Sequence, residues 1–238
     1  MRTLKVCITG EDRSQELAIS HHLKSLFDHD HPGQSHLRIA LEDFQVQGPS
    51  GLHHRCLVFP ALGMSLTQLR DCLDDRALDK GLLQRYLFVI LTALDFCIRR
   101  ESHIRVRCST LTAERVKLTV NLDLSPNNIL VGANASIVAK VEQAEIAEPS
   151  PRKVLANRTI HLSYTMPSSF DPPIITDFGA ARLGEPGQKY SGDVMPGVFR
   201  APEVVAGMEW DSKIDIWSVG VMVCAMSASS LKSMLTII

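Results

Sequence analysis

Two short segments organise this 238-residue chain: Asn121-Leu122-Asp123-Leu124-Ser125-Pro126-Asn127-Asn128-Ile129-Leu130 and, downstream, Thr176-Asp177-Phe178-Gly179. Asp123 is followed five residues later by Asn128, at the entrance to an expected strand, and Asp177 comes further along the chain. Phosphoryl transfer needs such a set, with one carboxylate for the acceptor hydroxyl and two oxygen ligands for Mg²⁺. The alternative is an Asn/Pro-rich turn followed by an unrelated Asp-Phe-Gly turn, and neither segment alone decides between the two.

Composition and charge set the outer limits. With 45% hydrophobic and 21% charged residues, the chain has the make-up of a soluble globular polypeptide of one domain or two small lobes. The net charge of -1 gives no argument for direct nucleic-acid binding or for an acidic membrane surface. The longest apolar run, near residues 216–226, is too short to span a bilayer, and the charged N-terminus excludes a secretory signal. The six cysteines form no C-x-x-C pair, which suggests neither a zinc site nor a disulfide framework.

The first thirty residues predict a strand and then a helix. Residues 3–8 alternate, with Leu4, Val6 and Ile8 on one face and Lys5 on the other. A helical pattern follows from residue 12, with Glu16 in its first turns. Its apolar face holds Ile19, Leu23, Leu26 and Phe27. Taken alone, Lys5 and Glu16 are best explained as a surface lysine and a solvated glutamate.

Residues 36–60 predict two strands around the turn 48–51. The first strand alternates through Leu37, Ile39, Leu41 and Val46, and residues 56–59 form the return. A crossing from apolar to turn residues follows at 60–65, which by itself is a plain interdomain connection. Two helices come next, and both of their apolar stripes are expected in the core. Ser65 caps the first, which carries Leu66, Leu69, Cys72 and Leu73, and Asp79 opens the second, which carries Leu83, Tyr86, Leu87, Ile90, Leu94 and Cys97.

Two stretches interrupt this pattern. Residues 103–120 are basic and predict a solvated extra loop, with a docking patch as the alternative. About forty residues separate the expected strands 129–131 and 174–176, and this proline-rich gap predicts an insert. Within it, residues 145–158 predict a short helix and a loop packed on the molecule, with a partner-binding excursion as the alternative.

The chain resembles the protein kinases. Beyond the two opening segments, Ala201-Pro202-Glu203 closes an activation-segment-like stretch, and Asp211-Ser212-Lys213-Ile214-Asp215-Ile216-Trp217-Ser218-Val219-Gly220 matches the family's buried supporting helix. Small-molecule phosphotransferases lack both features. Several phrases are similar to fungal kinases related to the SR-protein kinases, namely His31-Pro32-Gly33, Leu62-Gly63-Met64-Ser65-Leu66, Glu148-Pro149-Ser150-Pro151-Arg152-Lys153-Val154, Gly192-Asp193-Val194-Met195-Pro196 and Arg200-Ala201-Pro202-Glu203-Val204.

The resemblance implies a fold and a division into lobes. The fold is of the α+β class, a bilobal protein kinase-like fold with a truncated small lobe and a mostly helical large lobe that ends near the Asp215 helix. The small lobe keeps the family's third to fifth strands and the helix among them. Residues 1–238 would form a partial kinase domain, with a small-lobe remnant at 1–60 and a large lobe at 61–238 that has inserts at 103–120 and 132–173.

The resemblance also implies a set of site residues. Asp123 would orient the acceptor hydroxyl, Lys5 would hold the ATP phosphates, and Glu16 would hold Lys5 in place. Asn128 and Asp177 would bind Mg²⁺. The hinge would place Phe59 as gatekeeper behind the adenine, with a Leu62 amide donor and a Pro60 carbonyl beside the base. Buried Asp215 would accept hydrogen bonds from catalytic-loop amides.

The expected function is a serine/threonine kinase that uses Mg-ATP. Its partners would be protein substrates, of the kind rich in Arg and Ser, in the cytoplasm and/or nucleus, with no membrane and no direct nucleic acid. Three departures favour the alternative, a catalytically dead kinase-like binding protein or a non-functional fragment. Leu122 and Ser125 replace the family's usual Arg and Lys, and Asn121 replaces its His.

The ends of the sequence raise the same question. Met1 precedes the Lys5 strand by two residues, so the family's Gly-rich phosphate loop has no counterpart, and residues 228–238 match nothing in the family. We hypothesise an incomplete gene model or alternative product, in which retained intervening sequence would explain both the tail and residues 103–120. A transcript that matches every residue would refute this hypothesis.

Overall fold

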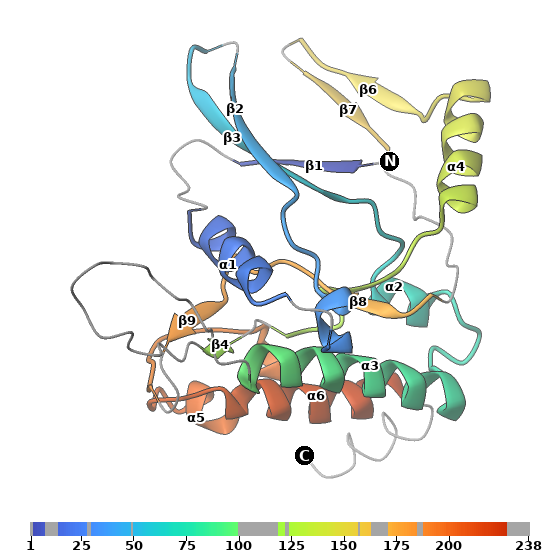
Figure 1. The fold of residues 1–238 in the computed structure, drawn as a ribbon. Helices are drawn as coiled ribbons and strands as arrows, with labels where there is room; N and C mark the ends of the chain where they lie inside the picture. Colours follow the sequence, from blue (N-terminus) through green and yellow to red (C-terminus); the bar gives the residue numbers. More distant parts are fainter. Residues whose placement is uncertain are drawn as a thin grey trace.

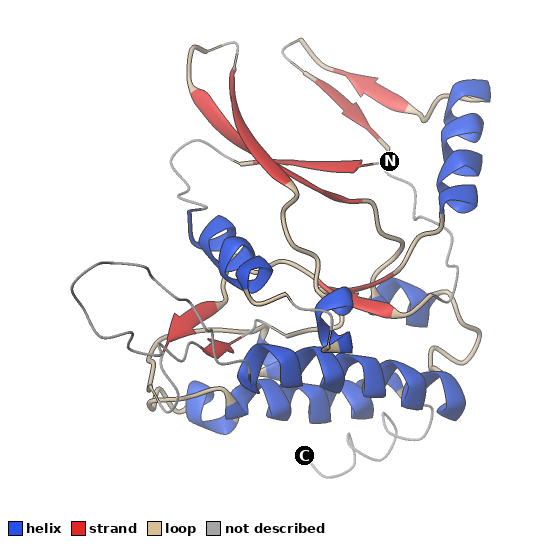
Figure 2. Cartoon of the chain, in the orientation of Figure 1, coloured by secondary structure: helices blue, strands red, loops and turns tan. Residues whose placement is uncertain are grey.

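The computed structural model describes nine stretches of the chain: 2–7, 14–27, 30–48, 50–99, 119–121, 124–156, 158–162, 171–184 and 188–227. The larger sheet and a small hairpin lie in the upper part of the molecule in Figure 1, shorter strands lie in its middle, and two long helices run side by side along its lower edge. Figure 2 shows the same division by secondary structure. The predicted tail and the first two catalytic-loop residues after Asn121 lie outside the described residues.

A three-stranded antiparallel sheet forms the upper part, in the order β1-β3-β2. Its strands are β1 (Arg2–Val6), β2 (Glu42–Gln47) and β3 (His53–Pro60). The predicted first strand and hairpin are therefore confirmed, and Gly51 supplies the turn with a φ of 79°. The first strand of the hairpin begins later than predicted, at Glu42, because residues 38–41 belong to no strand and Leu37 makes only an isolated bridge to Ile175.

One face of this sheet is covered by α1 (Ser14–Ser25), as Figure 1 shows. Leu17 of α1 packs against the buried cluster of Ala40, Leu57 and Phe59. The alternate residues Leu4 and Val6 lie on the other face and are exposed. Of the predicted α1 face, three members are buried, namely Ile19, Leu23 and Leu26, while Phe27 is 37% exposed and meets the ring of Phe96 edge-on.

The main core lies below the sheet. It joins α1, α2 (Leu66–Asp71), α3 (Lys80–Arg99), β5 (Ile129–Val131), β8 (Pro173–Ile175) and α6 (Lys213–Met226). The 3₁₀ helix η1 (Pro32–His36) packs against α3. Ser65 caps α2 in a reciprocal capping box with Gln68, which confirms the predicted cap. Cys72 was expected in the core but is exposed, because α2 ends at Asp71 and Cys72 leaves its buried face.

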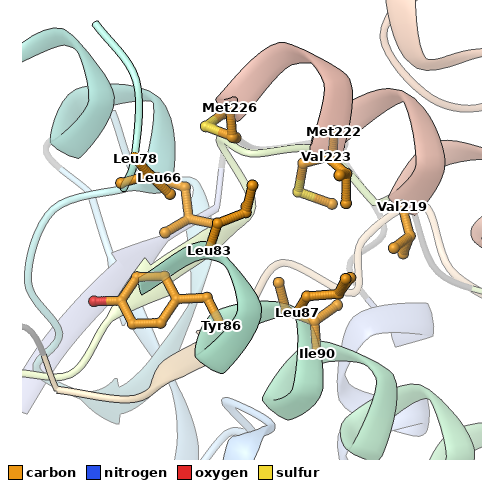
Figure 3. A pocket seen from close by; sticks show the side chains of 10 residues that line it. All are labelled: Leu66, Leu78, Leu83, Tyr86, Leu87, Ile90, Val219, Met222, Val223 and Met226. Atoms are coloured by element: carbon orange, nitrogen blue, oxygen red, sulfur yellow. The ribbon is translucent and has the colours of Figure 1, made fainter. Parts of the chain in front are cut away.

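The two long helices pack closely. A cavity of only about 10 Å³ remains where α3 and α6 meet α2 and the residue Leu78. Figure 3 shows the ten side chains that line it. Lys80–Ile98 of α3 is long and apolar enough to cross a membrane by length and composition alone, a segment that the search for uninterrupted apolar runs missed. In this structure Tyr86, Ile90, Leu94 and Cys97 of α3 are buried in the main core, while Phe88 and Leu91 are exposed.

The long insert separates two strands that pair directly, since β5 and β8 are antiparallel neighbours. It contains α4 (Ala135–Ala147) and a small hairpin of β6 (Arg152–Val154) and β7 (Thr159–His161), which stand beside the sheet in Figure 1. The helix expected at 145–158 is misplaced. The Asn134 side chain accepts from the Ile137 N–H and starts the helix ten residues earlier than predicted.

The remaining elements are a strand before β5 and the segments after Asp177. Residues 103–118 of the predicted basic loop lie outside the described residues, but its last two residues belong to β4 (Thr119–Asn121), which pairs with β9 (Arg182–Gly184). Then come η2 (Gly197–Phe199) and α5 (Pro202–Val205). Trp210 is buried, stacks on Tyr190 and donates its indole N–H to the Gly192 carbonyl at 3.0 Å, which fixes this segment against α6.

Candidate active site

Lys5 sits in the middle of β1, paired in register with Leu57 of the central strand. The covering helix α1 brings Glu16 opposite, and Lys5 Nζ lies 3.0 Å and 2.9 Å from its two carboxylate oxygens. Glu16 is only 2% exposed, whereas the Lys5 side chain is 32% exposed. A buried carboxylate of this kind needs a partner, because an isolated charge in the interior is strongly disfavoured. The pair therefore fixes the position of α1 relative to the sheet.

Asp177 follows β8 and reaches the same lysine. Its Oδ1 atom lies 3.1 Å from Lys5 Nζ, and Gly179 donates its N–H to the same atom at 3.3 Å. Phe178 is buried in the main core and anchors the turn. Asp177 has a φ of 59°, a left-handed conformation that non-glycine residues rarely adopt and that costs about 1–3 kcal/mol. Such strain is typical of functional sites.

Asn128 is tied to the residue before Asp177. The Asn128 carbonyl accepts both the N–H of Thr176 at 2.8 Å and its hydroxyl at 3.0 Å. On the other side, the Asn128 N–H donates to the Ser125 carbonyl at 3.0 Å. These bonds place the residue immediately before β5 beside the residue immediately after β8. Asn128 and Asp177 therefore emerge from the same end of a two-stranded ladder.

Three other residues of the predicted catalytic loop are Leu122, Asp123 and Ser125. Asp123, the predicted catalytic carboxylate, and Leu122 lie outside the described residues, so the role of Asp123 stays a prediction. Ser125 is 1% exposed, and its hydroxyl has no hydrogen-bond partner among the described residues. Because this hydroxyl is buried and uncharged, Ser125 does not supply the cation that many kinases have at this position.

The predicted hinge begins at the end of β3. Phe59 is 4% exposed and lies in the small cluster under the sheet, and Pro60 is the last residue of the strand. The chain then crosses to the lower part, where two backbone hydrogen bonds attach it to β5. The Gly63 N–H donates to the Val131 carbonyl at 2.9 Å, and the Val131 N–H donates to the Met64 carbonyl at 2.9 Å. Leu62 is at the crossing. The roles of Phe59, Pro60 and Leu62 toward adenine stay predictions.

Arg38 is a site residue that the sequence reasoning missed. Its Nε and Nη2 atoms both donate to the Pro60 carbonyl, at 3.1 Å and 2.9 Å, and its guanidinium carbon lies 4.9 Å from the centre of the Phe59 ring. Burial lowers the pKa of Arg38, while the charges of Glu16 and Asp177 act in the opposite direction. The available signal was a single arginine between the buried residues Leu37 and Ile39.

The donor set suits a hard divalent cation. Asn128 and Asp177 offer amide and carboxylate oxygens, which are the ligands that Mg²⁺ prefers, with the remaining positions filled by water or phosphate. The Asp177 side chain is 48% exposed, so a metal–phosphate group could reach it. Deeper in the structure, Asp215 is fully buried on α6. Burial raises the pKa of the Cys97 thiol strongly, and the nearby charge of Asp215 adds to this.

Comparison with known proteins agrees with this geometry. Residues 166–234 match the protein kinase domain family. A serine/threonine protein kinase of Aspergillus fumigatus is 34% identical over 225 residues, which cover 92% of this chain and 49% of the relative. The serine/threonine-protein kinase SRPK of Physarum polycephalum is 25% identical over 202 residues, covering 80% of this chain and 45% of that protein. The chain thus spans about half the length of these curated relatives.

The fold is also similar to that of a solved kinase domain. A crystal structure of a kinase domain superimposes with a TM-score of 0.61 over 97% of this chain and 57% of that one, at 19% sequence identity. At this identity the likeness concerns the fold alone, and it confirms the predicted α+β kinase-like architecture. The sequence matches supply the family, with the similarity to SR-protein kinases resting on the more distant relative. By sequence and by fold, the chain belongs to the protein kinase family.

Proposed function

We propose that this protein transfers the γ-phosphoryl group of a Mg²⁺-bound nucleoside triphosphate, ATP in the family, to serine or threonine hydroxyls of proteins. The observation that carries the proposal is the position of Lys5 Nζ, which lies within 3.1 Å of both Glu16 and Asp177. These residues come from a strand, a helix and a loop that are far apart in the sequence. In protein kinases, phosphoryl transfer requires a strand lysine paired to a helix glutamate, together with a metal-binding aspartate.

Each residue then has a distinct part in the reaction. Lys5 would hold the α- and β-phosphates, while Glu16 keeps its side chain extended toward them. Asn128 and Asp177 would hold Mg²⁺, which neutralises charge on the phosphates as the transfer proceeds. Asp123 would orient the acceptor hydroxyl and take its proton. The hydroxyl oxygen bonds to the γ-phosphorus as the bond to the leaving nucleoside diphosphate breaks.

The protein substrate is the less defined half of the proposal. Similarity to the Physarum SRPK and the fungal phrases in the sequence support Arg/Ser-rich proteins as substrates, in the cytoplasm or nucleus. No described residue cluster identifies an arginine-binding surface, so this preference rests on the relatives alone. A second candidate, a binding protein without catalysis, is favoured by Ser125, whose buried hydroxyl cannot replace a phosphate-binding lysine.

A transfer assay separates the two candidates. The purified 238-residue chain would be incubated with γ-labelled ATP, Mg²⁺ and an Arg/Ser-rich peptide, next to a matched peptide with alanine in place of serine. We expect serine-dependent label transfer that Asp123→Asn reduces at least a hundredfold. Loss of transfer with unchanged nucleotide binding would place Asp123 in the chemical step. Transfer by the wild-type chain that survives in Asp123→Asn would contradict the mechanism.

A further inference from the structure

Arg38 binds together two of the connections between the upper and the lower part of the molecule. Figure 1 shows one connection that rises from η1 to β2 and another that descends from β3 to α2. The first contains residues 37–41, and the second starts from Pro60, the last residue of β3. The Nε and Nη2 atoms of Arg38 both donate to the Pro60 carbonyl, at 3.1 Å and 2.9 Å. A side chain of one connection therefore holds the start of the other.

The main chain of Arg38 is held by a different strand. Its N–H donates to the Ile175 carbonyl at 2.9 Å, and the preceding residue, Leu37, forms an isolated parallel bridge to Ile175. Ile175 is the last residue of β8, two positions before Asp177, and both Leu37 and Ile175 are buried in the main core. Arg38 thus joins the end of β3, through its side chain, to the end of β8, through its main chain.

A guanidinium suits a rigid link of this kind. Two N–H groups of one planar fork meet a single acceptor, and the guanidinium carbon lies 4.9 Å from the centre of the Phe59 ring, which together fix the orientation of the side chain. Hydrogen bonds from a charged donor are also roughly twice as strong as neutral ones. Burial lowers the pKa of Arg38, and the charges of Glu16 and Asp177 act in the opposite direction. The half-buried guanidinium is therefore within electrostatic reach of the two carboxylates that bind Lys5.

We propose that Arg38 is a positioning residue that fixes β3 relative to β8 and so holds Lys5 in place opposite Asp177. Lys5 lies on β1, which pairs with β3 in continuous register, whereas Asp177 follows β8. A change in the angle between β3 and β8 would therefore change the contact between Lys5 and Asp177, which measures 3.1 Å in this structure. The link itself is independent of catalysis, and its consequence for the reaction rests on the proposed function.

Hydrogen exchange in the 238-residue protein without nucleotide tests the link. Arg38→Met keeps an unbranched stem but has no N–H groups to donate, and Arg2→Met is the matched control, an arginine of the same sheet whose side chain is 59% exposed. The reporters are the hydrogen-bonded amides of Gly63, on the hinge side, and Thr176, beside Asp177. We expect both amides to exchange on the order of tenfold faster in Arg38→Met and at the wild-type rate in Arg2→Met. Amides in the middle of α3 report general unfolding and should stay unchanged.

The Mg²⁺ requirement of phosphoryl transfer tests the consequence for the reaction. Residues that orient a metal ligand typically change metal affinity 10–100-fold when they are replaced. At saturating ATP we expect the Mg²⁺ concentration for half-maximal transfer to rise on the order of tenfold in Arg38→Met. The KM for the peptide should not change, because the displaced group is Asp177 and not the peptide site. Arg38→Lys should behave like Arg38→Met, since lysine keeps the charge but lacks the planar fork.

The outcomes separate the link from the proposed function. Faster exchange at Gly63 alone, or an equal acceleration in α3, would overturn the link. An unchanged Mg²⁺ requirement in Arg38→Met, or wild-type behaviour of Arg38→Lys in both measurements, would overturn the positioning role. Faster exchange at both reporter amides in a protein that transfers no phosphate would support the link and refute the proposed function instead. Should Arg38→Met lack a cooperative unfolding transition, the same measurements on Arg38→Lys decide.

Discussion

Lys5 and Arg38 are two cations in one site, but different partners hold them. Lys5 is bound by two carboxylates, those of Glu16 and Asp177, whereas Arg38 is bound by the Pro60 carbonyl and the Phe59 ring. The lysine is thus part of an ion-pair network that phosphates and a metal can join. The arginine donates instead to a neutral acceptor at the end of β3. The difference separates a cluster of paired charges, which phosphates and a metal can join, from a neutral contact at the predicted hinge.

Removing the charge of Glu16 should have the largest effect, on this cluster of paired charges. In Glu16→Gln, Lys5 keeps only Asp177 as a carboxylate partner, so the lysine and the metal compete for that residue. We expect phosphoryl transfer to fall roughly a hundredfold, because misplacement of such groups by about 1 Å has that effect. Steady-state transfer to the Arg/Ser-rich peptide is the measurement.

The matched control for Glu16 is Glu42→Gln. Glu42 also pairs with a strand residue, Arg2, but both side chains of that pair are 59% exposed, and such pairs contribute little. We expect transfer by Glu42→Gln to equal that of wild type. Equal losses in the two variants would mean that any glutamate paired to β1 matters, and the special position of Glu16 would have to be abandoned.

Thr176→Val should have a smaller effect, on the contact that holds Asn128 beside Asp177. The change removes the hydroxyl bond to the Asn128 carbonyl while the backbone bond remains. We expect a loss of about 1 kcal/mol in the free energy of unfolding, measured with urea. Thr92→Val is the control, since its hydroxyl bonds to Phe88 on the outer side of α3, and it should cost less than about 0.5 kcal/mol. Equal costs would show that the Thr176 bond has no special importance.

The smallest expected effect is a pH dependence that acts through the helix of Glu16. Burial lowers the pKa of His22 below its ordinary value of 6.5. The unfolded chain therefore takes up the proton first as the pH falls, and stability is lost below about pH 6.5. Replacing His22 with Gln should reduce the difference in unfolding free energy between pH 7 and pH 5.5 by about 1 kcal/mol or less. His21→Gln, at the exposed neighbour, should leave that difference unchanged, and an equal effect of both would contradict the assignment.

Local signals predicted the elements where a cap or an alternation lay in the sequence itself. Ser65 and Asp79 predicted the starts of α2 and α3. The Ser65 side chain accepts the N–H of Gln68, and the Asp79 side chain accepts those of Gly81 and Leu82. Lys5 and Glu16 look like ordinary surface residues when taken alone, and their position before the later motifs made them site candidates. Local patterns could not show that the pair would reach Asp177, because this contact joins residues 172 positions apart.

The misses have physical causes of the same kind. Residues 37–41 alternate like a strand, but they form no continuous ladder. Arg38 donates its backbone N–H to Ile175 of β8, and Leu41 donates to Val58 of β3. The Arg38 side chain contacts the Pro60 carbonyl. The helix in the insert was misplaced because its start depends on Asn134, a cap that is hard to tell from a turn asparagine. In both cases tertiary contacts decided between local alternatives of similar merit.

We propose that Lys5, Glu16 and Asp177 together form a site for a Mg-nucleotide. Thermal unfolding of the 238-residue chain with and without Mg-ATP, next to Asp177→Ala, tests it most directly. At a hundred times the dissociation constant a ligand adds about 2.7 kcal/mol of stability, so even weak binding is visible at high nucleotide concentration. We expect a Mg²⁺-dependent rise in melting temperature that disappears in Asp177→Ala. An unchanged melting temperature in wild type, or an equal rise in the variant, would contradict it.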